Sequence, residues 1–135
     1  MIDVNIPPSS QEAEDAILGA IIELPSLLDE VSGYLSNDIF YYDRSRILYS
    51  ILLDMHKNEE AIDMVTITGK LSQRDKNSGV TSYYISGLLG AGTPRLAKRY
   101  AVQVYEKHLL RQVISQSTEI SQSAYKNNQD VYNIL

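Results

Sequence analysis

The apolar positions of this chain recur at intervals of three and four residues, which is the spacing of one face of an α-helix. In the first such segment Ala13, Ile17 and Ile21 share a face, and Ser9 or Ser10 stands just before it. Serine at that place is a typical helix N-cap, because its hydroxyl accepts a hydrogen bond from one of the unpaired N–H groups of the first turn. The same periodicity continues along the chain and predicts an all-α fold.

Further helices are predicted before residue 94. Their expected starts are Pro25, tolerated in a first turn, and the N-cap residues Asp43 and Asp63. The second helix carries Leu28 and Leu35 on its apolar face, and the fourth is expected to end at Leu71. A short helix is expected around Tyr83 and Tyr84, after the break at residues 77–79. Together these elements form a small globular helical head, residues 1–93.

Residues 94–126 predict one long helix, because Thr93-Pro94 gives a cap and a start and no other Gly or Pro follows. At 1.5 Å per residue this helix would be about 50 Å long. A compact domain of this chain length is under about 40 Å across, so the helix should protrude. Its inner half is expected to pack on the head through Leu96, Tyr100, Val104 and Leu109.

The outer half of the long helix carries a second apolar stripe that the head is too small to cover. Its residues are Leu110, Val113, Ile114, Ile120 and Ala124. An apolar stripe without a core beneath it requires a partner, so we interpret these residues as a self-association or partner-binding surface. Tyr84 is a further candidate contact on the head. Asp130 would cap another helix, within residues 127–135, that is too short to be stable alone, and we expect the chain to continue beyond it.

Charge is unevenly distributed along the 135 residues, which have a net charge of −5. Residues 1–93 carry −8 and residues 94–126 carry +4. The basic helix could attract an acidic partner or a second copy, although solvated helix faces explain the same pattern. An acidic chain should bind DNA weakly, if at all. The absence of cysteine, of a signal peptide and of a long apolar run favours a cytoplasmic protein with no membrane segment.

No motif in the sequence predicts catalysis. A phosphate-binding loop is missing, since neither Gly-Lys-Ser/Thr nor G-x-G-x-x-G occurs. The only histidines, His56 and His108, lack the spacing of a metal site. Paired glutamates at 12 and 14, or at 59 and 60, do not face each other on a helix. We therefore expect a chain that is not an enzyme and that binds no cofactor or metal.

A series of short segments runs through the chain: Ile6-Pro7-Pro8, Glu12-Ala13-Glu14, Leu18-Gly19, Asp38-Ile39-Phe40-Tyr41, Asp43, Arg46-Ile47-Leu48-Tyr49, Ile62-Asp63-Met64-Val65-Thr66, Gly79, Tyr83-Tyr84, Tyr100-Ala101 and Glu106 through Arg111. In this order they resemble the N-terminal domain of DnaB-type replicative DNA helicases. Each piece is short, but together they cover most of residues 6–125.

The resemblance implies that residues 94–126 are the first arm of a helical hairpin and that residues 127–135 begin a truncated second arm. In that family the hairpins pair, and dimers form the collar of a hexameric helicase, which also receives a DnaG-type primase. The collar would thus mediate subunit assembly and primase docking in DNA replication. ATP and Mg would belong to the ATPase domain, which is absent from this chain. The alternative is the helicase-binding domain of a primase, or another non-enzymatic helical interaction module.

Overall fold

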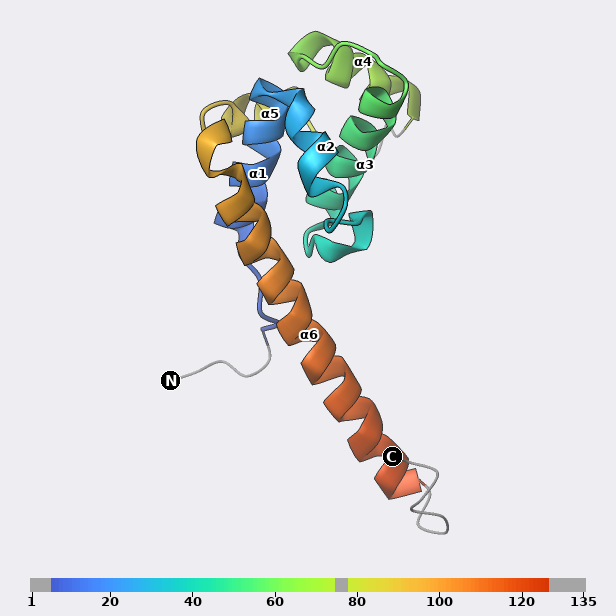
Figure 1. The fold of residues 1–135 in the computed structure, drawn as a ribbon. Helices are drawn as coiled ribbons and strands as arrows, with labels where there is room; N and C mark the ends of the chain where they lie inside the picture. Colours follow the sequence, from blue (N-terminus) through green and yellow to red (C-terminus); the bar gives the residue numbers. More distant parts are fainter. Residues whose placement is uncertain (1–5, 75–77, 127–135) are drawn as a thin grey trace.

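The computed structural model describes residues 6–74 and 78–126, and all regular structure within these ranges is helical (Figure 1). The elements are α1 (Gln11–Glu23), the 3-10 turn η1 (Pro25–Leu27), α2 (Leu28–Val31), η2 (Asn37–Ile39), α3 (Asp43–Lys57), α4 (Met64–Arg74), α5 (Ser82–Leu88), η3 (Pro94–Leu96) and α6 (Ala97–Lys126). The predicted all-α class is confirmed. The helix expected to start at Asp130 lies outside the described residues.

Two of the predicted helix starts are confirmed by their hydrogen bonds. The Ser10 hydroxyl accepts a bond of 3.1 Å from the N–H of Ala13 at the start of α1. At the start of α4, the N–H of Thr66 donates to a carboxylate oxygen of Asp63 at 2.8 Å, and the N–H of Asp63 donates to the Thr66 hydroxyl at 2.9 Å. Each pair satisfies backbone donors that the helix leaves unpaired, and this fixes where the helix begins.

The structure corrects three details of the sequence prediction. Asp43 is the first residue of α3 and not its N-cap, which is Tyr42, because the Asp43 carboxylate is paired with Arg46 one turn later. The fourth helix runs past Leu71 to Arg74. Leu35 lies beyond the end of α2, yet it is fully buried, because the chain folds back over the core there.

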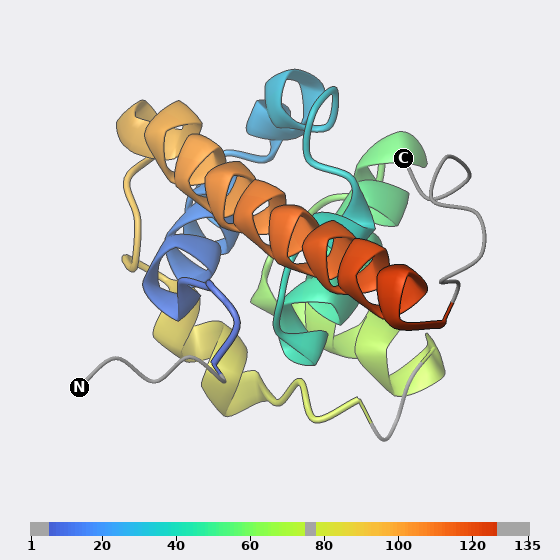
Figure 2. The ribbon, with the colours of Figure 1, turned by 90° about the horizontal axis from the view of Figure 1, so that it is seen from below.

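The core of the head is built around α1, which packs against α3, α5 and the inner part of α6 (Figures 1 and 2). Ile17, Leu18 and Ile21 of α1 are completely buried. On α3, Tyr49 contacts the ring of Phe40, with 4.7 Å between ring centroids, and its hydroxyl donates to the carbonyl oxygen of Leu35 at 2.7 Å. In the described part of the chain the core is therefore mainly aliphatic, with Phe40 and Tyr49 as its buried aromatic pair and the Tyr49 hydroxyl hydrogen-bonded.

Helix α6 leaves the head after its first few turns and projects away from it (Figure 1). Its inner part contacts α1 through the buried residues Ala97, Ala101 and Val104. Two alanines at this contact allow the helix backbones to approach closely. Thirty residues of α6 correspond to a length of about 45 Å. A helical head with a long protruding helix is the predicted architecture. No helix within the described ranges is both long and apolar enough to cross a membrane.

Candidate interaction surface

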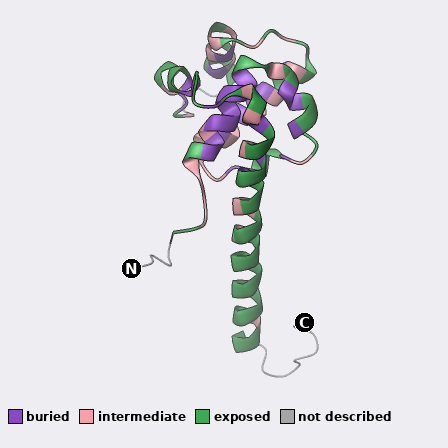
Figure 3. Ribbon diagram, turned by 60° about the vertical axis from the view of Figure 1, so that its left-hand side comes forward, coloured by how far each residue is buried: buried purple, intermediate pink, exposed green. Residues whose placement is uncertain are grey.

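The outer half of α6 is exposed along its whole length (Figure 3). After Arg111, every described residue of the helix except Ser123 is exposed. The large apolar side chains of the predicted stripe keep about half of their surface in solvent: Leu110 48%, Val113 60%, Ile114 51% and Ile120 49%. Ala124, one turn further, is exposed too. The structure thus places five of the six predicted surface residues together on one uncovered helix.

The exposed stripe lies on the side of α6 that points away from the head. At 3.6 residues per turn, Val113 and Ala124 lie roughly half a turn around the helix from Ala97, Ala101 and Val104, which face the head. The prediction that Leu109 packs on the head is wrong for this reason: Leu109 lies on the outward side and is 40% exposed. The apolar face therefore changes sides between the inner and the outer half of α6.

In the outer half of α6, polar residues occupy the side that is in line with the head-facing residues Ala97, Ala101 and Val104. Ser115, Thr118 and Gln122 lie there, and all three are exposed. The outer half of α6 is thus amphipathic in its own right, with an apolar face that the head could not cover even if the head were larger. We call the exposed residues Leu109, Leu110, Val113, Ile114, Ile120 and Ala124 the outward stripe.

Arg111 marks the point at which α6 loses contact with the head. Its guanidinium donates to the carbonyl oxygen of Pro8 at 2.8 Å and to that of Ile39 at 2.6 Å. It also lies over the ring of Tyr41, 5.3 Å from the centroid. One side chain of the helix is thus bonded to two separate segments of the head. The sequence placed Arg111 among the basic residues of 94–126 and in a segment that resembles the family, but predicted none of these contacts.

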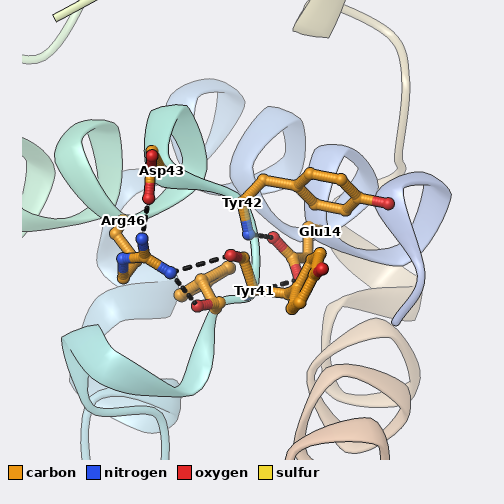
Figure 4. A network of polar contacts seen from close by, with 6 residues as sticks. Glu14, Tyr41, Tyr42, Asp43 and Arg46 are labelled. Atoms are coloured by element: carbon orange, nitrogen blue, oxygen red, sulfur yellow. Dashed lines mark hydrogen bonds and ion pairs between the residues drawn. The ribbon is translucent and has the colours of Figure 1, made fainter. Parts of the chain in front are cut away.

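The Tyr41 segment is in turn held by Glu14, a carboxylate with only 2% of its surface exposed (Figure 4). It accepts hydrogen bonds from the backbone N–H groups of Tyr41 at 2.9 Å and of Tyr42 at 3.3 Å. From the other side, Arg46 donates to the carbonyl oxygens of Phe40 at 3.0 Å and Tyr41 at 2.7 Å. Loop residues 40–42 are therefore fixed through their backbone.

Burial raises the pKa of Glu14 above its ordinary value of 4.5, against the opposing effects of the two backbone N–H groups and the charge of Arg111. From the sequence, Glu14 was considered as one of two glutamates that do not face each other and as part of a family-like segment, and its burial was not predicted. A signal was present, because Glu14 precedes Ile17 by three residues and Ile21 by seven, and so lies on the buried face of α1. A carboxylate on such a face requires hydrogen-bond donors inside the fold.

Tyr84, the sixth predicted surface residue, lies on α5 in the head and not beside the outward stripe. It is half-buried; its hydroxyl donates to Asp15 at 2.9 Å and its ring is covered by the guanidinium of Arg44, 4.5 Å from the centroid. Burial raises the pKa of the Tyr84 hydroxyl. Its neighbour Tyr83 is 89% exposed and is the more accessible of the two. A contact role for Tyr84 stays a prediction.

The described residues also include an exposed histidine–aspartate pair and a groove. Among them, no group of three or more His, Asp or Glu side chains could hold a metal ion. His56 Nε2 lies 2.8 Å from an oxygen of Asp29 in an exposed pair. A groove of about 590 Å³ lies where the start of α1 meets the base of α6, and Glu12, Glu106 and Lys107 are among its lining residues. The uncovered apolar face of α6 is the more distinctive feature.

The described residues form an all-α domain, a helical head that carries an uncovered amphipathic helix. Residues 6–106 match the sequence model of the DnaB-like helicase N terminal domain, and the chain belongs to this family. This is the family that the resemblance implied. Because the match is to the helicase, the alternative of a primase domain is not retained.

Known relatives agree with the family. The chain is 33% identical to the replicative DNA helicase DnaC of Bacillus subtilis, in an alignment that covers all of this chain and 30% of the relative. It is 34% identical to the replicative DNA helicase DnaB of Geobacillus stearothermophilus over 93% of this chain and 28% of that protein. The chain thus spans less than a third of the length of these relatives.

Solved structures show the same fold. The crystal structure of the N-terminal domain of DnaB helicase from Mycobacterium tuberculosis superimposes with a TM-score of 0.87 at 27% identity, covering 94% of this chain and 92% of that one. A DnaB-like replicative helicase, whose structure was described with its interactions with primase, matches with a TM-score of 0.73 at 21% identity. That match covers 87% of this chain and 28% of the helicase, and it shows the fold alone.

Proposed function

We propose that this chain is the assembly and docking domain of a hexameric replicative DNA helicase, and that the outward stripe of α6 is its subunit interface. The observation that carries the proposal is that five large aliphatic side chains, Leu109, Leu110, Val113, Ile114 and Ile120, lie exposed on one side of a helix that the head leaves uncovered. In the parent protein, the second hairpin arm and a neighbouring subunit would cover them.

The energetics favour such a cover. Burying one aliphatic side chain is worth about 1.5–3 kcal/mol, so even half of this surface, buried across several residues, offsets much of the entropy lost on association. The polar residues on the opposite side of α6 leave that side in water. A partner helix placed along the outward stripe would therefore bury the apolar side of α6 in a bundle-like packing and leave its polar side exposed.

Sedimentation equilibrium of the chain and of two matched double variants tests the interface. Ile114→Asp/Ile120→Asp places two charges on the outward stripe, and Ser115→Asp/Gln122→Asp places the same charges on the polar side of the same helix. We expect the first to shift the chain to monomer and the second to leave its association unchanged, with the melting temperature of the head similar in both. Equal association of both variants, or unfolding of the isoleucine variant, would contradict the proposal.

We further propose that the assembled domain receives a DnaG-type primase. Support comes from the family and from a relative whose structure was described with its interactions with primase. Titration calorimetry should detect a complex between this chain and the C-terminal domain of the cognate primase. If the isoleucine variant loses this binding and the serine–glutamine variant keeps it, the primase binds assembled subunits. If the primase domain binds neither the wild-type chain nor the full-length helicase, docking at this domain is excluded.

ATP and Mg belong, in this proposal, to the motor domain of the parent, and the cytoplasm is where the parent acts. This chain alone should neither hydrolyse ATP nor unwind duplex DNA, since its sequence has no phosphate-binding loop. DNA-stimulated ATPase activity in a pure preparation of the chain would contradict this assignment.

A further inference from the structure

We propose that Arg111 is a positioning residue that fixes the direction in which α6 leaves the head, with residues 6–9 acting as a strap across the base of the helix. Arg111 is not part of the proposed interface; it sets the direction in which α6 carries the outward stripe. Its consequence for assembly rests on the proposed function, but the positioning itself is a property of one chain.

The contacts of Arg111 join three parts of the chain that are far apart in sequence. Pro8 precedes α1 and Ile39 ends η2, and both carbonyl oxygens accept from the same guanidinium, at 2.8 Å and 2.6 Å. The planar, forked guanidinium can bond two carbonyls in fixed directions, which a lysine ammonium cannot do with the same rigidity. These bonds therefore restrain the rotation and tilt of α6, and not only its distance from the head.

Partial burial strengthens this restraint. Burial lowers the pKa of Arg111, since it disfavours the charged form, while the nearby Glu14 carboxylate acts in the opposite direction. The ring of Tyr41 covers one face of the guanidinium, so water has restricted access to the bonds. Hydrogen bonds from a charged donor are about twice as strong as neutral ones.

The support beneath Arg111 is itself rigid. Glu14 and Arg46 hold residues 40–42 from both sides through backbone hydrogen bonds, so the ring of Tyr41 has a fixed base (Figure 4). Burying a carboxylate costs free energy unless it is hydrogen-bonded. The buried Glu14 carboxylate is bonded to the loop in which the ring of Tyr41 lies against Arg111 of α6. The network from Glu14 through Tyr41 to Arg111 thus links the interior of the head to the helix.

Because of the position of Arg111, a change in the direction of α6 at this residue would displace the whole outer half of the helix. Fifteen residues separate Arg111 from Lys126, or about 22 Å at 1.5 Å per residue. A tilt of about 20° at Arg111 would move the tip by roughly 8 Å, which is close to the full distance between two packed helices. A small loss of restraint at Arg111 would therefore misalign the outward stripe with any partner.

Because the chain has no cysteine, a pair of spin labels can report this angle directly. Cysteines replacing the exposed Lys57 on α3 and Gln122 on α6 would be labelled, and the labelled chain diluted into excess unlabelled chain so that only distances within one molecule are read. We expect one narrow distance distribution in the wild-type background. Arg111→Gln should broaden it by several ångströms while the melting temperature of the head changes little.

Two further variants make the result decisive. Arg99→Gln removes an exposed arginine of the same helix that makes no ion pair with a described residue, and it should leave the distribution narrow. Arg111→Lys keeps the charge and the aliphatic stem, and it should broaden the distribution because it lacks the fork. A narrow distribution in either Arg111 variant, or unfolding of the head in both, would overturn the proposal. A broad distribution with normal association would preserve it and count against the outward stripe as the interface.

Discussion

Gly19 of α1 lies directly against the backbone of Leu88 at the end of α5, so closely that a Cβ atom on Gly19 would collide with the Leu88 carbonyl oxygen. The two helices thus touch backbone to backbone at this point. A similar contact occurs at Gly92, where a Cβ would collide with the carbonyl oxygen of Ala16 in α1. Close packing therefore explains the glycine of Leu18-Gly19, which ends the first segment that resembles the family.

Gly19→Ala should destabilise the head by about 1–3 kcal/mol, because the added methyl group overpacks a contact made by backbone atoms that cannot move aside. Urea denaturation followed by circular dichroism measures the change. Gly69→Ala is the matched control: Gly69 lies in α4 with no atom within 4 Å of an added Cβ. It should stabilise by about 0.5–1 kcal/mol through helix propensity. Equal effects at the two sites would contradict the close contact.

Tyr49→Phe should cost about 1–3 kcal/mol, since it leaves the buried carbonyl of Leu35 without its donor and keeps the ring packing on Phe40. Tyr83→Phe, at a position that is 89% exposed, removes the same hydroxyl in water and should change stability by less than about 0.5 kcal/mol. If both variants unfold at the same urea concentration, the buried bond contributes nothing.

The periodic pattern predicted the longer helices, because apolar residues at intervals of three and four mark the face that packs on the core. It also predicted that α6 protrudes, since that follows from its length alone. The pattern failed at Leu109, because the apolar face of α6 changes sides between the contact with α1 and the outer half. When one periodicity is applied to the whole of α6, apolar residues that point in opposite directions are assigned to the same face.

The polar network at the base of α6 could not be predicted from spacing. Arg111 bonds to Pro8 across 103 positions of sequence, and its partners are backbone carbonyls, which carry no signature in side-chain identity. Glu14 was partly predictable from its register with Ile17, but its donors, the N–H groups of Tyr41 and Tyr42, were not. Contacts between side chains and a distant backbone depend on the fold and become visible only in it.

DNA binding by this chain should be weak and should disappear near physiological salt. Arg95, Lys98 and Arg99 at the base of α6 are exposed and make no ion pair with a described residue, but the chain as a whole is acidic. Three phosphate contacts on single-stranded DNA would give a slope of log K against log salt of about −2. Fluorescence anisotropy of a labelled oligonucleotide measures the slope, and replacing the three residues with glutamine should abolish binding at low salt. Tight binding at physiological salt would contradict the prediction.

The unfolding free energy of the head should depend on pH through the buried carboxyl of Glu14. Because burial raises its pKa in the folded state above the ordinary 4.5, the folded chain binds the Glu14 proton more tightly than the unfolded chain does. The stability that Glu14 contributes is therefore fully present below about pH 4.5 and is lost as pH rises through the folded-state pKa. Glutamine at this position cannot titrate, so the difference in unfolding free energy between wild type and Glu14→Gln isolates this dependence.

Urea denaturation at a series of pH values from about 4 to 7 should show the wild-type advantage over Glu14→Gln falling as pH rises. Glu23→Gln, at an exposed position at the end of α1, controls for the removal of one negative charge. A wild-type advantage that grew with pH would mean that the N–H groups of Tyr41 and Tyr42, together with Arg111, outweigh burial and hold the carboxylate ionised. In that case Glu14 and Arg111 would act as an ion pair at the base of α6, and Arg111→Gln should then raise the pKa of Glu14 from its lowered value, which the same titration would detect.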